Sequence, residues 1–540
     1  MVSLNKFIVK NHLYLISVLF IILMIILKPI YGTTDDFILD SWLNGTYTGE
    51  FENDSIFISS FASNLFSFLY SLTNVLPWYT MTLLLLNFIS CIFIIFQITK
   101  NKNISSTNYL ILLITLFFFL IWSYIRITYT STGIILAIAA LVSFYYSTKL
   151  NNKKLLIISI VFSFLAFSIR PESLIAVLIF FYPIFLFKFK KARLIFPKMW
   201  LLLGALTIIF GLNWLIENNQ KEDFKEYRTW AKQVQSFAGR PTMEIVAKNI
   251  GNSGWTTSEY NSFKDLTYFD PKIFNDKWIN SGLEITKNYY FNPNLAPNNI
   301  LNIFENIYKS LSIFLITLLF IVILVYQNSM KNKKLLVIFI GNFIIMNFLL
   351  GLYFQNVARV SVPILIGIIV FLIIVLDNQI NNKVFIPIAL FVVVILSVFV
   401  FNMNSENMDK ILRNLSNTNF IKNNYSQNII LIHGNQEFAQ FVNPYSFDKV
   451  DQNPNVFMIG NWDTFSPHWY QRANKLGIDG QDLTYELLNN KKLLWTAPSI
   501  PDTTFNLKNL LKEQGFGEIE AVRIDSLPDG NDIRALSLKE

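Results

Sequence analysis

Long apolar runs recur along this chain of 540 residues, and they limit its possible folds more than any other feature. The runs approach or reach the ~20 residues that an α-helix needs to cross a bilayer. Hydrophobic residues make up 53% of the chain and charged residues only 15%, which argues against an ordinary water-soluble fold. The sequence therefore predicts a polytopic α-helical membrane protein. About eleven spans are expected: 13–31, 79–99, 108–126, 131–147, 154–169, 172–187, 199–216, 306–326, 335–353, 358–376 and 384–402.

Basic residues gather in short segments between these spans. With the N-terminus taken as cytoplasmic, the segments lie on the inner side, as the positive-inside rule requires. The outer segments hold nearly all of the acidic residues. We therefore attribute the net charge of +8 to topology and not to nucleic-acid binding. The inner basic residues are Lys100, Lys102, Lys149, Lys153, Lys154, Lys188, Lys190, Lys191, Arg193, Lys198, Lys331, Lys333 and Lys334.

Three polar segments face the outside in this topology, which is that of a multi-pass protein of the cell (plasma) membrane. Residues 32–78 and 217–305 form two outer loops of a membrane domain that covers residues 1–402. Ser55 to Leu76 is apolar enough for one or two helices at the membrane interface. Residues 403–540 alternate short apolar runs with helical patterns near 482–491 and 505–514, so they predict an extracytoplasmic mixed α/β domain.

The first apolar segment and the few cysteine and histidine residues exclude other classes. No small-x-small cleavage pattern precedes Lys28, so a retained anchor is favoured over a cleaved signal peptide. Cys91 is the only cysteine, so an intrachain disulfide is impossible. The three histidines argue against a histidine-rich metal centre. Phosphate-binding glycine loops, nucleophile elbows and metalloprotease helix motifs do not occur in the sequence.

Six acidic residues without a basic one follow the first span: Asp35, Asp36, Asp40, Glu50, Glu52 and Asp54. Asp35 and Asp36 come directly after the span, where a helix over Phe37 to Leu43 is expected to begin. Either Thr34 or Asp35 caps that helix, or the pair is functional. Capping explains one carboxylate more easily than two adjacent ones with Asp40 a turn further on. We expect Glu50, Glu52 and Asp54 to be rim or acceptor contacts.

At the membrane–water boundary on the outer face, a carboxylate pair is suited to activate the hydroxyl of an acceptor, which then attacks a donor held in the membrane by its lipid tail. A buried carboxylate beside another has a raised proton affinity and can act as a general base, so Asp35 and Asp36 are the catalytic candidates. A divalent cation, Mg²⁺ or Mn²⁺, shared by Asp35 and Asp36 is the competing arrangement.

Three arginines lie at predicted outer ends of spans, where a positive charge is disfavoured: Arg126, Arg170 and Arg359. The planar guanidinium group matches phosphate, so each is a candidate for the lipid phosphate of a donor. Each could also be a snorkelling residue. Pro171 and Glu172 follow Arg170, so a helix is expected to break there, and Glu172 could neutralise Arg170. We favour Arg170 or Arg359 as the phosphate contact and include Glu172 and Asp40 among the substrate-binding candidates.

Trp255 is a further candidate in the second outer loop. The sequence from Thr256 to Glu259 has capping-box spacing, which predicts a helix directly after Trp255. Trp255 is then either a packing aromatic beside a turn or part of a substrate-facing element. His433 and His468 have no Ser or acidic partner at a telling spacing, so we interpret both as structural.

The layout resembles the GT-C class of integral-membrane glycosyltransferases, which includes protein O-mannosyltransferases and lipid A aminoarabinose transferases. The shared elements are an acidic pair in the first outer loop, about eleven spans, a large later loop and a soluble C-terminal module. Three short motifs are also similar to a pattern in bacterial surface-polysaccharide membrane proteins: Asp35-Asp36-Phe37, Gly45-Thr46-Tyr47-Thr48-Gly49 and Pro77-Trp78-Tyr79. The resemblance covers about the first 300 residues.

In that class the first-loop acid is the general base or a metal ligand, which corresponds here to Asp35 or Asp36. The resemblance thus implies transfer of a hexose or pentose from a polyprenyl-phosphate-linked donor to a hydroxyl of an outer-face glycan or glycolipid, with membrane lipid as the other partner. The chain lacks a Trp-Trp-Asp signature, so transfer to protein asparagine is not expected.

Three other functions remain open at this point. A polysaccharide polymerase would use the outer arginines on two lipid-linked glycans. A transporter or flippase for lipid-linked glycans would need charges near the middle of the bilayer, whereas here they cluster at the ends of the spans. A non-catalytic assembly protein would tolerate neutralisation of the acidic pair.

Overall fold

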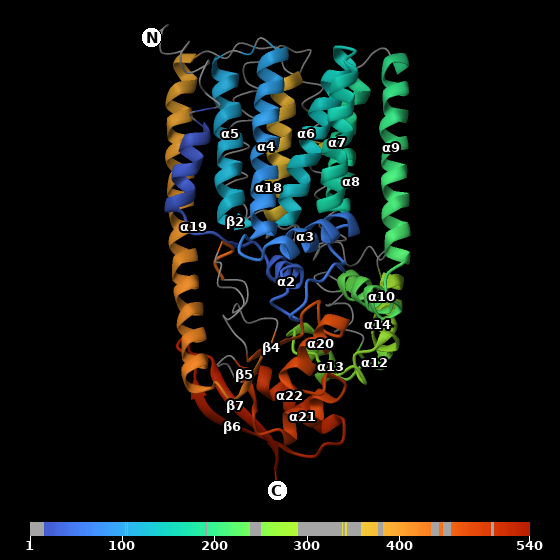
Figure 1. Cartoon of the computed structure of the whole chain (residues 1–540), viewed down its shortest axis with the longest axis vertical. Coiled ribbons are helices and arrows are strands. Elements are labelled where there is room, and N and C mark those ends of the chain that lie inside the picture. Colours follow the sequence, from blue (N-terminus) through green and yellow to red (C-terminus); the bar gives the residue numbers. More distant parts are fainter. Residues whose placement is uncertain are drawn as a thin grey trace.

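The computed structural model describes residues 14, 16–102, 104, 106–188, 192–237, 250–289, 337, 341–342, 358–375, 382–433, 442–445, 455–497 and 502–539. Long helices run side by side in one half of the molecule, and shorter helices and a β-sheet fill the other half (Figure 1). The last described residues, which follow β7 (Asp532–Leu538), lie at the end of the molecule away from the helical half.

The described residues include six helices that are long and apolar enough to cross a membrane, as expected of a polytopic helical protein. The predicted spans 79–99, 108–126 and 131–147 match α4, α5 and α6, which are among these six, whereas the predicted span 154–169 falls on α7, a helix of 17 residues that is not. The span 306–326 lies outside the described residues, as does most of 335–353, so the total of about eleven stays a prediction. Among the described residues, the bundle contains a short apolar helix, Ile16–Ile26, and the helices α4 (Trp78–Asn101), α5 (Ser106–Ile125), α6 (Tyr129–Lys149), α7 (Lys153–Ile169), α8 (Pro171–Lys188), α9 (Ala192–Asn218), α18 (Ala358–Val375) and α19 (Asn382–Asn424).

Two predicted inner lysines cap helix ends in the bundle. Lys102 Nζ lies 2.6 Å from the carbonyl oxygen of Ile373, in the last turn of α18. Lys198 Nζ lies 2.6 Å from the carbonyl oxygen of Ser147, in the last turn of α6. The ammonium groups thus offset the partial negative charge of these helix C-termini.

The polar end of the bundle is closed by two short helices, α2 (Thr34–Leu43) and α3 (Ser60–Leu72). Figure 1 shows α3 lying across the ends of the long helices. Leu65, Phe68 and Leu72 on α3 are exposed, whereas Phe66 and Tyr70 are buried in the core. An exposed apolar stripe at this level is what the predicted interfacial helix requires.

A short parallel pairing joins the start of the first loop to the head of α6. Strand β1 (Ile30–Tyr31) pairs with β2 (Arg126–Ile127), with Ile30 opposite Arg126. The residues just after β1 and just after β2 therefore lie side by side. This pairing brings the predicted acidic pair next to Tyr129.

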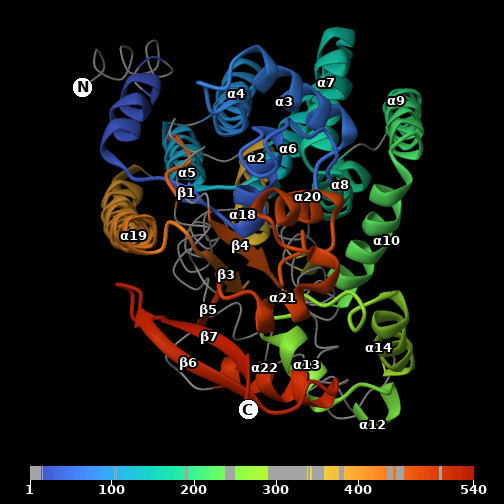
Figure 2. The same ribbon diagram turned by 60° about the horizontal axis from the view of Figure 1, so that its bottom comes forward.

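The second predicted outer loop contains α10 (Glu222–Phe237), α12 (Ile250–Ser253), α13 (Thr257–Lys264) and α14 (Asp276–Tyr289). The capping box that the sequence predicts is present. The Thr256 side chain accepts from the Glu259 amide, and the Glu259 side chain accepts from the Thr256 amide. Figure 2 shows α13 beside α22 (Asp502–Glu513) of the C-terminal segment.

The C-terminal segment forms a five-stranded mixed sheet of order β4-β3-β5-β7-β6. Strands β3 (Ile429–His433), β4 (Val456–Ile459) and β5 (Leu493–Ala497) are parallel, and β6 (Ile519–Ser526) and β7 (Asp532–Leu538) add antiparallel pairs. The short helices are α20 (Pro467–Leu476), η3 (Gly480–Asp482) and α21 (Leu483–Asn489). The five strands overlap the short apolar runs of this segment, at residues 429–432, 456–459, 493–495, 520–524 and 533–538.

The boundary predicted at residue 403 lies inside a helix. Helix α19 continues from the bundle to Asn424, and its residue Ile421 packs under the sheet with Ile430 and Leu494. Asn407 Nδ2 donates to the carbonyl oxygens of Lys28 and Ile125, which binds the polar half of α19 to the end of the bundle. One continuous helix therefore connects the two halves.

Candidate active site

Helix α2 places the acidic pair at the polar end of the bundle. Thr33 is the N-cap residue, with extended backbone angles, and its side chain accepts from the Asp36 amide. The helix thus begins at Thr34, three residues before the predicted start at Phe37, and Thr33 caps it in place of Thr34 or Asp35. Since the neutral side chain of Thr33 caps the N-terminus of α2, neither carboxylate is needed as the N-cap.

Asp36 is fully buried and accepts three hydrogen bonds. The donors are the Tyr79 hydroxyl at 2.9 Å, the Tyr129 amide at 3.0 Å and the Thr33 hydroxyl at 2.7 Å. Burial raises the pKa of Asp36 to about 6, and the three hydrogen bonds oppose that rise. Asp36 therefore holds α2, α4 and α6 together and still titrates near neutral pH.

Asp35 occupies a different environment. Its side chain is 24% exposed and lies 3.5 Å from Arg359 at the start of α18. A guanidinium group carries five N–H donors, so one contact of this length leaves it able to bind a second anion. Of the two acids, Asp35 is the one that an incoming molecule can reach.

Arg170 lies between α7 and α8, where the sequence predicts a helix break. It caps α7, and α8 begins at Pro171. Its guanidinium donates to the Tyr129 hydroxyl at 3.2 Å, lies over the Tyr129 ring and pairs with Glu172 at 3.0 Å. A Cβ atom on Gly133 would lie 2.9 Å from the Arg170 Cβ, so the glycine makes room for this packing.

Four of the predicted charged residues converge around Tyr129. The charges of Arg170, Asp35, Arg359 and Asp36 all act on the Tyr129 hydroxyl. The structure thus brings together side chains from α2, the break between α7 and α8, and the start of α18. Such a site combines a reachable carboxylate with two guanidinium groups.

Asp40 belongs to a second, closed network behind the pair. It is buried and accepts hydrogen bonds from the hydroxyls of Tyr31 and Tyr70. The Tyr70 hydroxyl also accepts from the Tyr79 amide at 3.0 Å. These contacts make Asp40 a structural support of α2, α3 and α4.

The structure places Arg126 and Trp255 in other surroundings. Arg126 faces α19 and lies 3.8 Å from Glu406. Trp255 is buried, its ring stacks on Trp278 at 3.7 Å, and its indole N–H donates to the Trp278 carbonyl oxygen at 2.9 Å. The packing interpretation of Trp255 fits these contacts.

The later acids of the first loop have partners in the second loop and in α20. Glu52 accepts from the Thr48 hydroxyl at 2.9 Å and lies 3.5 Å from His468 Nδ1. Burial lowers the pKa of His468 to about 3, so this histidine is neutral. Asp54 accepts from Gln220 Nε2 at 2.6 Å. These contacts tie the first loop to the second loop and to α20, which together with the C-terminal sheet form the part of the molecule that we call the polar layer (the described residues of 219–289 and 425–539).

Sequence reasoning missed Asp463, which lies in the turn between β4 and α20. It is fully buried and accepts from the Tyr47 hydroxyl at 2.6 Å. Burial raises the pKa of Asp463 to about 7, and the negative charge of Asp35 adds to that rise. The neighbouring Trp462 packs against Trp42 and Phe57. No local pattern predicts this placement, because the partners lie more than 400 positions away.

The residues present do not fit a cation shared by Asp35 and Asp36. Both Asp36 oxygens accept hydrogen bonds, and Asp35 faces Arg359. In the described parts of the chain, no three His, Cys, Asp or Glu side chains are grouped so that they could hold a metal ion.

Comparison of the chain with protein-family models, curated proteins and solved structures gives no match.

Proposed function

We propose that this chain is a membrane glycosyltransferase of the GT-C class, which moves a sugar from a polyprenyl-phosphate carrier to a hydroxyl of an outer-face glycan or glycolipid. One observation carries the proposal. Asp35 is partly exposed at the end of the helix bundle and lies 3.5 Å from Arg359, and its charge also acts on Arg170. A base and two anion-binding groups are what such a transfer requires.

In the proposed reaction, Asp35 takes the proton from the acceptor hydroxyl. The acceptor oxygen then forms a bond to the anomeric carbon of the donor sugar, and the bond between that carbon and the phosphate oxygen breaks. The polyprenyl phosphate leaves with the electron pair. Arg359 and Arg170 stabilise its charge, and Asp36 fixes the head of α2 so that Asp35 keeps its position.

The proposed topology rests on the apolar segments and the distribution of basic residues in the sequence. The N-terminus is cytoplasmic, about eleven helices cross the plasma membrane, and the polar layer with the sheet is extracytoplasmic. A lipid-anchored donor then enters from the bilayer beside the bundle, and the acceptor arrives from the polar layer. The acidic site lies where the two meet.

Purified protein in liposomes, supplied with a radiolabelled polyprenyl-phosphate sugar and a cell-envelope glycan acceptor, tests the proposal. Asp35→Asn should lower the transfer rate by about 10²- to 10⁴-fold, because a general base is lost. Asp409→Asn, an exposed acid on α19, is the matched control and should transfer normally. If Asp35→Asn transfers at the unchanged rate, the proposal is wrong. A product of altered chain length would point to a polymerase.

A further inference from the structure

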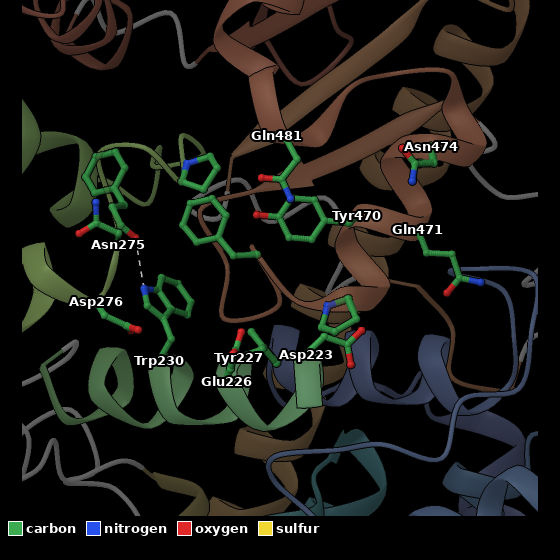
Figure 3. A pocket seen from close by; sticks show the side chains of 14 residues that line it. Asp223, Glu226, Tyr227, Trp230, Asn275, Asp276, Tyr470, Gln471, Asn474 and Gln481 are labelled. Atoms are coloured by element: carbon green, nitrogen blue, oxygen red, sulfur yellow. Dashed lines mark hydrogen bonds between the residues drawn. The ribbon is translucent and has the colours of Figure 1, made fainter. Parts of the chain in front are cut away.

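A cavity of about 730 Å³ lies in the polar layer, between α10, the turn before α14, and α20 (Figure 3). Its size falls in the ~300–1,000 Å³ range of small-molecule sites. In Figure 3 the Trp230, Tyr227 and Asp223 side chains come from α10, and Tyr470, Gln471 and Asn474 come from α20 on the other side. The mechanism proposed for the acidic pair does not use these residues.

Aromatic rings form the inner part of this cavity. Tyr227, Trp230 and Phe274 are buried, and Tyr470 is partly exposed. The Trp230 indole N–H donates to the Phe274 carbonyl oxygen at 3.2 Å, which fixes the ring. The Tyr470 ring is therefore the one of this set with a face open to a ligand, and the buried rings support the wall behind it.

Short polar side chains surround the rings. Asp223, Glu226 and Asp276 are exposed carboxylates, and Asn474 and Gln481 are exposed carboxamides. None of the described lining residues is Lys, Arg or His. A rim of this kind accepts and donates many hydrogen bonds and repels anions.

We propose that this cavity binds a short stretch of neutral or amino-sugar glycan. Pyranose rings have apolar C–H faces that stack on aromatic rings, and their hydroxyl or amino groups fit a rim of carboxylates and carboxamides. Uronic acids and phosphorylated sugars should be repelled by the three carboxylates, because the described lining residues include no cationic side chain. A peptide would place backbone amides against apolar rings, which leaves them without partners.

The cavity wall continues toward the acidic site. The Tyr227 hydroxyl donates to the Trp462 carbonyl oxygen at 2.5 Å, and Trp462 packs on Phe57. The guanidinium group of Arg170 also lies over the Phe57 ring, 5.6 Å from its centre. The bound glycan is therefore the acceptor chain beyond the reacting sugar, an assignment that rests on the proposed function.

Binding is measured on the full-length protein in lauryldimethylamine oxide, because a detergent with a sugar headgroup would compete. The probes are fluorescent hexasaccharides of glucose, galactose, mannose, N-acetylglucosamine and glucosamine, with oligogalacturonate as the anionic probe. At least one neutral or amino-sugar probe should bind, and oligogalacturonate should not. Tyr470→Ala should weaken binding about fivefold or more, as expected for one lost stacking contact. Tyr485→Ala, an exposed tyrosine on α21 outside the cavity, is the matched control.

The inference fails if no neutral or amino-sugar probe binds, if oligogalacturonate binds as well, or if both tyrosine variants behave alike. It also fails if an unrelated random peptide pool displaces the bound probe. Asp35 does not line the cavity, so Asp35→Asn should bind the probe normally even though it fails in transfer. Transfer that fails while binding persists overturns the proposed reaction and the acceptor assignment but not the glycan site.

Discussion

The Tyr47 hydroxyl donates a hydrogen bond of 2.6 Å to Asp463, a residue 416 positions further along the chain. The contact joins the first loop after the N-terminal segment to the turn between β4 and α20. The second carboxylate oxygen of Asp463 is buried without a hydrogen-bond partner among the described residues. A carboxylate in such a place favours its neutral form.

Asp463→Asn should therefore stabilise the protein at alkaline pH. Burial raises the pKa of Asp463 from 3.8 to about 7, so this group favours the folded state below pH 4, and that contribution is lost as the pH rises through 7. The asparagine stays neutral throughout. At pH 8 the variant should gain up to ~4 kcal/mol in free energy of unfolding, from 1.36 kcal/mol per pKa unit.

Thermal unfolding followed by tryptophan fluorescence at pH 5 and pH 8 measures this difference. Asp479→Asn, which replaces an exposed acid before η3, is the control and should change the unfolding temperature little at either pH. An Asp463→Asn effect of equal size at both pH values would contradict the argument.

Substitution of Asp35 and of Asp36 should have different effects on stability and on transfer. Asp36→Asn replaces an oxygen that accepts hydrogen bonds by an amide donor, next to the Tyr129 amide and the Tyr79 and Thr33 hydroxyls. It should cost ~1–3 kcal/mol of stability, the penalty for unsatisfied buried groups. Asp35→Asn removes only a partly exposed ion pair and should cost less than ~1 kcal/mol, while it lowers the transfer rate by about 10²- to 10⁴-fold.

Chemical denaturation of both variants in the same detergent, together with the liposome transfer assay, distinguishes these outcomes. The observation that Asp35→Asn unfolds as easily as Asp36→Asn would mean that the site is structural. Burial raises the pKa of Asp36 from 3.8 to about 6, so the contribution of this group to the stability of the unchanged protein should be lost as the pH rises through 6, and Asp36→Asn should remove that pH dependence.

Arg170→Lys should weaken donor binding specifically. Lysine keeps the positive charge but loses the planar fork and the stacking on Tyr129 and Phe57. The KM for the polyprenyl-phosphate sugar should rise about tenfold, corresponding to ~1.4 kcal/mol, and the KM for the acceptor should stay the same. Arg126→Lys is the control, because Arg126 faces Glu406 on α19. Equal KM values for the two variants would exclude Arg170 as the phosphate contact.

The sequence predicts those features whose signals are local. Apolar length predicts α4 to α6, the Arg170-Pro171 pair predicts the break between α7 and α8, and the spacing of Thr256 and Glu259 predicts the cap of α13. A positive charge at the predicted outer end of a span singles out Arg170 and Arg359. Each of these depends on residues within a few turns of one another.

Features that depend on distant contacts are not predicted. Polar residues after position 402 suggest a new domain, yet α19 continues there because Asn407 and Ile421 find partners in the bundle and under the sheet. Asp463 looks like an ordinary turn residue. Its role arises only because the turn folds against the first loop. Likewise, residue type alone does not show that Arg126 faces Glu406 and not the acidic pair.

Gly460→Ala tests whether that turn is held in place by close backbone packing. Gly460 has φ +69°, and a Cβ atom there would overlap the backbone carbonyl of Leu266, so alanine should force the two turns apart. Gly477 has φ +75°, and a Cβ atom there would have no neighbour within 4 Å, so Gly477→Ala should carry only the ~1–2 kcal/mol cost of the left-handed backbone. Gly460→Ala should lose more stability than this control and expose the turn to limited proteolysis. Since the turn carries Trp462 and Asp463, transfer should fall as well. Equal stability and equal cleavage in the two variants would show that the turn adapts without strain.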